Sequence, residues 1–73
     1  MNETALQDAL KALLVEIAFM DEDDRDVAGV PGDLADIRHV RTYEEAMVLT
    51  HDKGLVFSTH DGAEFQLTIN RSR

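Results

Sequence analysis

Several features that would define a function or a compartment are missing from this 73-residue sequence. There is no cysteine, which excludes disulfide bonds and thiolate metal ligands. No run approaches the roughly 18 consecutive apolar residues that a membrane-spanning helix needs. The N-terminal segment MNETALQD has acids where an export signal would carry basic residues. We therefore expect one small cytoplasmic domain, 1–73, held together by apolar packing or completed by a partner subunit.

Basic residues are scarce in the first half of the chain. Residues 1–36 contain ten acidic residues and only two basic ones, whereas residues 37–73 contain five of each. The whole net charge of −8 thus lies in the first half. Binding to nucleic acid or to an anionic membrane requires Lys and Arg, so neither ligand is expected. A basic protein surface is the expected counterpart.

Motifs for catalysis and for cofactor or metal binding are also absent. The glycines at positions 29, 32, 54 and 62 form no phosphate-binding loop. The neighbours Ser58, Thr59, His60 and Asp61 cannot form a triad on a strand, because adjacent side chains point to opposite faces. His39, His51 and His60 do not have the spacing of a zinc site. We predict no catalytic residues, no cofactor and no metal site, and therefore no enzyme.

The acidic run itself partly resembles the start of a calcium loop. Glu22, Asp24 and Asp26 alternate as calcium ligands do, and an acid, Asp33, follows at the distance of the final ligand. However, Val27 occupies the position that requires glycine, and Asp33 is not the usual glutamate. The pattern favours a solvated acidic loop, and the sequence leaves cation binding open.

The segment before the acidic run predicts an amphipathic helix over about 4–20. Asn2 or Thr4 can cap it, and Thr4-x-x-Gln7 has the form of a capping box. Ala5–Met20 has no glycine or proline. At 100° per residue, one apolar face contains Leu6, Leu10, Leu13, Leu14, Ile17 and Met20. Val15 and Phe19 lie away from that face.

Residues 21–36 are predicted as an acidic loop, and residues 37–70 as an antiparallel meander. Gly29, Pro31 and Gly32 interrupt the loop, and Asp33 can cap one turn after them. A three-residue loop, 60–62, with Gly62 left-handed pairs Phe57 with Phe65 and Leu55 with Leu67.

The same loop form at 52–54, with Gly54 left-handed, pairs an earlier strand, Ala46–Thr50, with the strand that contains Phe57. Both hairpins would then share one apolar face made of Met47, Leu49, Leu55, Phe57, Phe65, Leu67 and Ile69. Thr42-x-x-Glu45 competes with this interpretation because it is also a capping-box pattern. Ile37–Thr42 is the candidate for a fourth strand. The fold class is α+β, a helix packed on a three- or four-stranded antiparallel β-meander, with Leu10, Leu13, Phe57 and Phe65 buried together.

The candidate partner-binding surface combines an acidic cluster with one aromatic side chain. Carboxylates held together at the end of a helix repel one another and meet the negative end of the helix dipole, and a basic partner would relieve both costs. Phe19 would add an apolar contact, unless Val27 or Val30 folds back over it. The candidate residues are Asp21, Glu22, Asp23, Asp24, Asp26, Asp33, Asp36 and Phe19.

The leading functional hypothesis is a non-catalytic inhibitor or adaptor that occupies the basic surface of a nucleic-acid-binding protein. Carboxylates on a rigid scaffold can imitate the phosphates of nucleic acid. Small phage-encoded anti-CRISPR and anti-restriction proteins share this size and charge, which is an analogy of class only. The alternative is a small homo-oligomeric assembly protein of phage or bacterial origin, a homodimer for example, that pairs through a strand edge or the Phe19 face.

Overall fold

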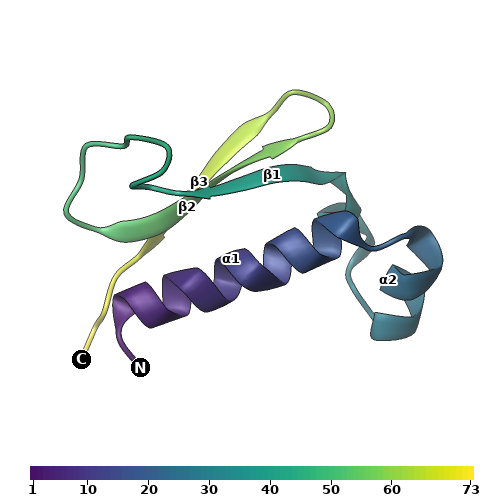
Figure 1. The fold of residues 1–73 in the computed structure, drawn as a ribbon, viewed down its shortest axis with the longest axis horizontal. Helices are drawn as coiled ribbons and strands as arrows, with labels where there is room; N and C mark the ends of the chain where they lie inside the picture. The colour runs from purple at the N-terminus through teal and green to yellow at the C-terminus, as the bar shows by residue number, and fades with distance from the viewer.

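The computed structural model describes residues 1–73 and shows helices packed on one face of a three-stranded antiparallel sheet (Figure 1). The elements in chain order are α1 (Glu3–Phe19), α2 (Glu22–Ala28), the 3-10 helix η1 (Gly32–Asp36), β1 (Ile37–Thr42), β2 (Lys53–Thr59) and β3 (Glu64–Ile69). The strand order is β1-β2-β3. The predicted α+β fold, a helix on an antiparallel meander, is confirmed, and Ile37–Thr42 is one of its three strands.

Helix α1 is capped by Asn2 and turns a different face to the sheet from the one predicted. The Asn2 side chain accepts the backbone N–H of Ala5 at 2.8 Å, so Asn2 is the N-cap and the predicted capping box at Thr4 does not form. Gln7 is buried instead of capping, whereas Leu13, expected in the core, is 51% exposed. The buried face of α1 is therefore rotated toward Gln7.

The core lies between α1 and the first two strands. Ile37, Val40 and Leu55 form its buried centre. Leu10, Leu14, Val15, Leu34 and Phe57 pack around that centre. Helix α1 contacts β1 and β2, and β3 lies beyond it. The predicted joint burial of Leu13 and Phe65 is therefore wrong, as is the prediction that Val15 points away from the core.

The predicted hairpin with its loop at 60–62 is confirmed. The Thr59 N–H donates to the Ala63 carbonyl at 2.9 Å, and Gly62 has a φ of 89°. Phe57 is paired with Phe65 and Leu55 with Leu67. The short three-residue loop closes because Gly62 adopts the left-handed conformation that other residues disfavour.

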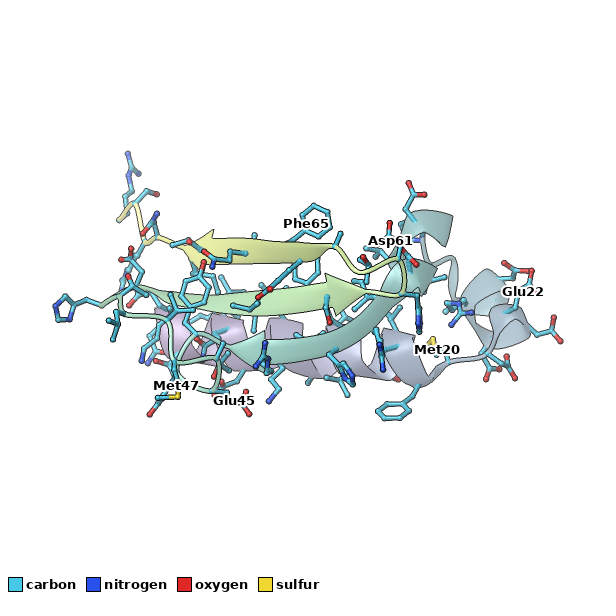
Figure 2. All side chains as sticks on the ribbon, turned by 90° about the horizontal axis from the view of Figure 1, so that it is seen from above. Met20, Glu22, Glu45, Met47, Asp61 and Phe65 are labelled. Carbon is cyan, nitrogen blue, oxygen red and sulfur yellow. The ribbon has the colours of Figure 1, made fainter.

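The predicted hairpin with its loop at 52–54 is wrong. No strand forms over Ala46–Thr50, and Met47 and Leu49 are 84% and 101% exposed. Residues 43–52 instead form an irregular connection at the end of the molecule where the chain termini lie (Figures 1 and 2). Gly54 belongs to β2, where it pairs with Thr68 and has no positive φ.

The alternative that the sequence left open, a turn after Thr42, is the one that forms. The Glu45 carboxylate accepts the Thr42 N–H at 2.9 Å, and the Thr42 hydroxyl accepts the Glu45 N–H at 3.1 Å. This reciprocal pair is a capping box. It turns the chain away from the sheet directly after β1.

Candidate protein-interaction surface

The acidic segment contains helix α2 and the 3-10 helix η1, so the prediction of a loop over 21–36 is wrong. Asp21 is the N-cap of α2, and its carboxylate accepts the Asp24 N–H at 2.8 Å. Gly29 ends α2 in the left-handed conformation, with a φ of 72°. A capping acid followed by a glycine eight positions later is a helix signal that the sequence already contained.

The second helix changes the electrostatics of the acidic run. Glu22, Asp23 and Asp24 lie in the first turn of α2, where the helix dipole favours negative charge. Arg25 donates from its guanidinium to the Met20 carbonyl, one of the unsatisfied acceptors that follow α1. The sequence-based argument named two costs for these acids, and α2 offsets the dipole cost for these three residues, whereas their mutual repulsion remains. Their position stabilises the start of α2.

The carboxylates of α2 have no basic partner within the molecule. Asp21, Glu22, Asp23, Asp24 and Asp26 are all exposed. The one ion pair of the structure joins Lys11, in the middle of α1, to Glu45, in the connection after β1. The negative charge of α2 is therefore available to another molecule.

Two further predicted residues lie in η1 and meet a carboxylate that the sequence analysis did not include. Asp33 is exposed and Asp36 is half-buried. Both line a shallow cavity of about 470 Å³ that also contains Asp61, from the β2–β3 loop. The Thr59 hydroxyl and the Ala63 N–H bond to Asp61 and lower the pKa of its carboxyl. Asp61 looked like an ordinary turn residue, and only the fold brings it to this cavity.

Phe19 and Val27 lie on a groove between the two helices. They are 87% and 91% exposed, so neither Val27 nor any other residue folds over Phe19. Phe19, Met20, Val27 and Ala28 line this groove of about 480 Å³ together with two acids, Glu16 and Asp24. An apolar groove with carboxylates at its rim is thus present where the sequence predicted an apolar contact beside acids.

The structure therefore gathers the predicted residues into two neighbouring groups at one end of the molecule. Figure 2 shows Met20 and Glu22 near that end, with Asp61 at the β2–β3 loop on the same side. The first group is Phe19 with the α2 acids, and the second is Asp33 and Asp36 with Asp61. Helix α2 contacts η1, which joins the two groups.

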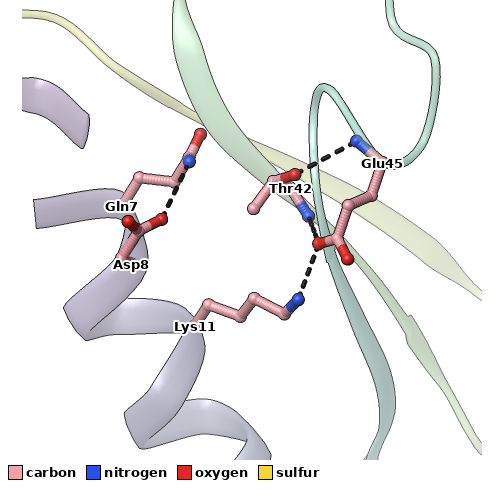
Figure 3. A network of polar contacts seen from close by, with 5 residues as sticks. All are labelled: Gln7, Asp8, Lys11, Thr42 and Glu45. Carbon is pink, nitrogen blue, oxygen red and sulfur yellow. Dashed lines mark hydrogen bonds and ion pairs between the residues drawn. The ribbon is translucent and has the colours of Figure 1, made fainter. Parts of the chain in front are cut away.

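A polar network away from these two groups connects α1 to the segment after β1. One oxygen of Glu45 accepts both the Lys11 ammonium at 2.6 Å and the Thr42 N–H at 2.9 Å (Figure 3). These hydrogen bonds, chiefly that from Lys11, lower the pKa of Glu45 to about 2. The network ties the connection after β1 to α1, and every group in it has a partner inside the chain.

No cluster of three or more His, Asp or Glu side chains has a metal-binding arrangement. The helical conformation of residues 22–28 also differs from the calcium loop considered from the sequence. Neither helix has the length and apolar character needed to cross a bilayer. The fold and the exposed groove define a small α+β protein with an acidic, apolar-centred surface. Comparison with protein families, with curated proteins and with solved structures found no match.

Proposed function

We propose that this protein is a non-catalytic binding module that occupies a basic, nucleic-acid-binding surface of another protein, as an inhibitor or an adaptor. The observation that carries the proposal is that Phe19, 87% exposed, lies beside the carboxylates of α2, which form no ion pair within the chain. Exposed apolar side chains that lie together in one groove, as Phe19 and Val27 do, are typical of contact sites. Helix α2 supplies the charge and Phe19 supplies an anchor.

The chemistry of the expected partner follows from the two parts of the surface. A line of carboxylates attracts Lys and Arg side chains that otherwise bind phosphates. An aromatic side chain at the centre of such a surface fills a pocket and excludes water from the surrounding charge pairs. A nucleic-acid-binding protein with an apolar pocket in its basic groove meets both requirements.

The experiment captures the partner from host lysate with the tagged protein and compares three forms of the bait. The test variant changes Glu22→Gln, Asp23→Asn and Asp26→Asn, and it keeps Asp21, the N-cap of α2. The control variant changes Glu3→Gln, Glu44→Gln and Asp52→Asn, three acids at the opposite end of the molecule. Both variants gain the same net charge, so only the position of the change differs.

The captured protein is then purified and titrated with its own nucleic acid. We expect the wild type and the control variant to compete with the nucleic acid, and the test variant to compete much less at low salt, where screening is weak. Equal competition by the test and control variants would mean that α2 is not the binding surface.

A further inference from the structure

The two free edges of the sheet differ in how they are protected against pairing. Strand β1 has exposed arginines at positions 38 and 41, and its register with β2 shifts between Ile37 and His39. Charges and bulges of this kind discourage another strand from adding to an edge. Strand β3 has less protection, because its one charge is Glu64 at its first position, and residues 65–70 contain no charge, proline or glycine. Figure 2 shows no strand beyond β3, and η1 lies near only the first residues of β3, where it lines a cavity with Ala63 and Phe65.

The backbone groups on the outer side of β3 are free to pair. In an antiparallel ladder, residues alternate between those bonded to the neighbouring strand and those that face away. The Thr59 N–H bonds to Ala63, so Phe65 and Leu67 are the next residues of β3 bonded to β2. The amide groups of Gln66 and Thr68 consequently point to the open edge.

The side of β3 that faces the helical layer is also uncovered. Phe65 and Leu67 pair with Phe57 and Leu55, so they share the face that packs on α1. They are nevertheless 52% and 41% exposed, because α1 lies over β1 and β2. An apolar strip thus runs beside the less protected edge.

The total surface of the chain is large for its mass. Its accessible area is 5477 Å². A compact monomer of 8.2 kDa is expected to expose about 4,500 Å². The excess, about 1,000 Å² over the whole chain, is large enough to include the roughly 800 Å² that each partner contributes to a standard interface. The radius of gyration, 13.0 Å, likewise exceeds the roughly 11 Å expected for this length.

We propose that β3 pairs with β3 of a second copy of this chain, which makes a two-fold symmetric dimer with one continuous six-stranded sheet. Antiparallel pairing centred on Leu67 places Phe65 opposite Ile69 of the second copy and joins the two apolar strips. The same register brings the Glu64 end of one strand beside the Arg71 end of the other. Residues 37–73 carry no net charge, so the sheet halves do not repel one another.

This interface is separate from the groove between α1 and α2, although Phe65 also lines the cavity that contains Asp33, Asp36 and Asp61. Neither Phe19 nor any residue of α2 belongs to it, so a dimer presents two copies of the acidic groove. Backbone pairing and apolar contact are insensitive to salt, whereas binding through α2 carboxylates weakens as salt rises. The two proposals can therefore fail independently.

The test is sedimentation velocity of the full chain over a wide concentration range, in low and in high salt. We expect a species of twice 8.2 kDa that persists in high salt. In parallel, amide hydrogen exchange of the wild type should show protection at Gln66 and Thr68 that increases with protein concentration. A monomer at every concentration, or outer β3 amides that exchange freely at high concentration, would overturn the proposal.

Two variants test whether the dimer interface lies at β3. Leu67→Lys places two positive charges at the symmetry axis, and Gln66→Pro removes an outward N–H without removing a bond to β2. Leu49→Lys is the matched control, because Leu49 is fully exposed and lies outside β3. We expect monomers from folded Leu67→Lys and Gln66→Pro, and a dimer from Leu49→Lys. A dimer that survives in either folded β3 variant contradicts pairing through β3, and the wild-type exchange data decide if both variants unfold.

Discussion

The side-chain oxygen of Gln7 accepts the backbone N–H of Gly54 at 3.1 Å, and both residues are buried. This hydrogen bond joins the second turn of α1 to the first part of β2. At the same residue, the Gly54 carbonyl accepts the N–H of Tyr43, where β1 ends. A polar side chain on the buried face of α1 is therefore explained by a backbone donor that nothing else satisfies.

We predict that Gln7→Leu lowers the free energy of unfolding by about 1–3 kcal/mol, because a buried N–H loses its acceptor. Thr4→Leu is the control, since Thr4 is exposed on the same helix and its replacement should change stability by about 0.5 kcal/mol or less. Urea unfolding followed by circular dichroism measures both values. Equal stability of the two variants would mean that the Gln7 hydrogen bond contributes nothing net.

Gly54 is required for close packing. A Cβ atom at this position would overlap the carbonyl oxygen of Leu67 and the ring of Tyr43. The Tyr43 hydroxyl lies 2.5 Å from that of Thr68, so the ring is held across the sheet and cannot move away freely.

We predict that Gly54→Ala destabilises the protein by about 1–3 kcal/mol or more through this overlap. Gly32→Ala has open space around its Cβ and no positive φ, and it should leave the melting temperature nearly unchanged. Thermal unfolding of the two variants gives the comparison. A Gly54→Ala variant as stable as Gly32→Ala would show that the Tyr43 ring is not fixed there.

Gly54 also shows why a local sequence pattern can predict the wrong structure. The same prediction, a three-residue polar loop that ends in a left-handed glycine, is correct at Gly62 and wrong at Gly54. Local geometry selects glycine in the first case, and contact with a distant tyrosine ring selects it in the second. A short apolar alternation at Met47 and Leu49 then completed a false strand, although those side chains are exposed.

Most elements that were predicted correctly are defined by neighbouring residues, although α2, which is also locally defined, was missed. Helix α1, the β2–β3 register and the Thr42–Glu45 box follow from local pattern. The position of α1 on the sheet does not, so the exposure of Phe65 was missed. At the candidate site, the α2 acids and Phe19 could be chosen from sequence, whereas Asp61 joins the site only through the fold.

The pH dependence of stability should contain a contribution from Glu45. Its pKa is lowered from 4.5 to about 2 in the folded chain, chiefly by the hydrogen bond from Lys11. A carboxyl with a lower pKa when folded stabilises the protein above its unfolded pKa, and that stabilisation is lost as pH falls through the folded value.

We therefore predict that the wild type loses stability between about pH 4.5 and 2, and that Glu45→Gln loses less over the same range. Melting temperatures of both proteins as a function of pH provide the comparison, and the carboxyl resonance of Glu45 gives its pKa directly. Because Glu45 is half exposed, added salt should reduce the difference. Parallel pH profiles for the two proteins would contradict this assignment.

The two parts of the proposed binding surface should affect different steps of complex formation. Charges on α2 act over distance, so the Glu22→Gln, Asp23→Asn, Asp26→Asn variant should lower the association rate, and more so at low salt.

Phe19 acts only in contact, so Phe19→Ala should mainly raise the dissociation rate, by about 30-fold if it is an interface hot spot. Phe19→Ala should not unfold the protein, because the side chain is 87% exposed. Surface plasmon resonance with the captured partner at several salt concentrations separates the two rates, with Leu49→Ala as the control for removal of an exposed apolar side chain. Unchanged dissociation of Phe19→Ala would mean that the groove between α1 and α2 is not the contact, even if the acids of α2 still steer the partner.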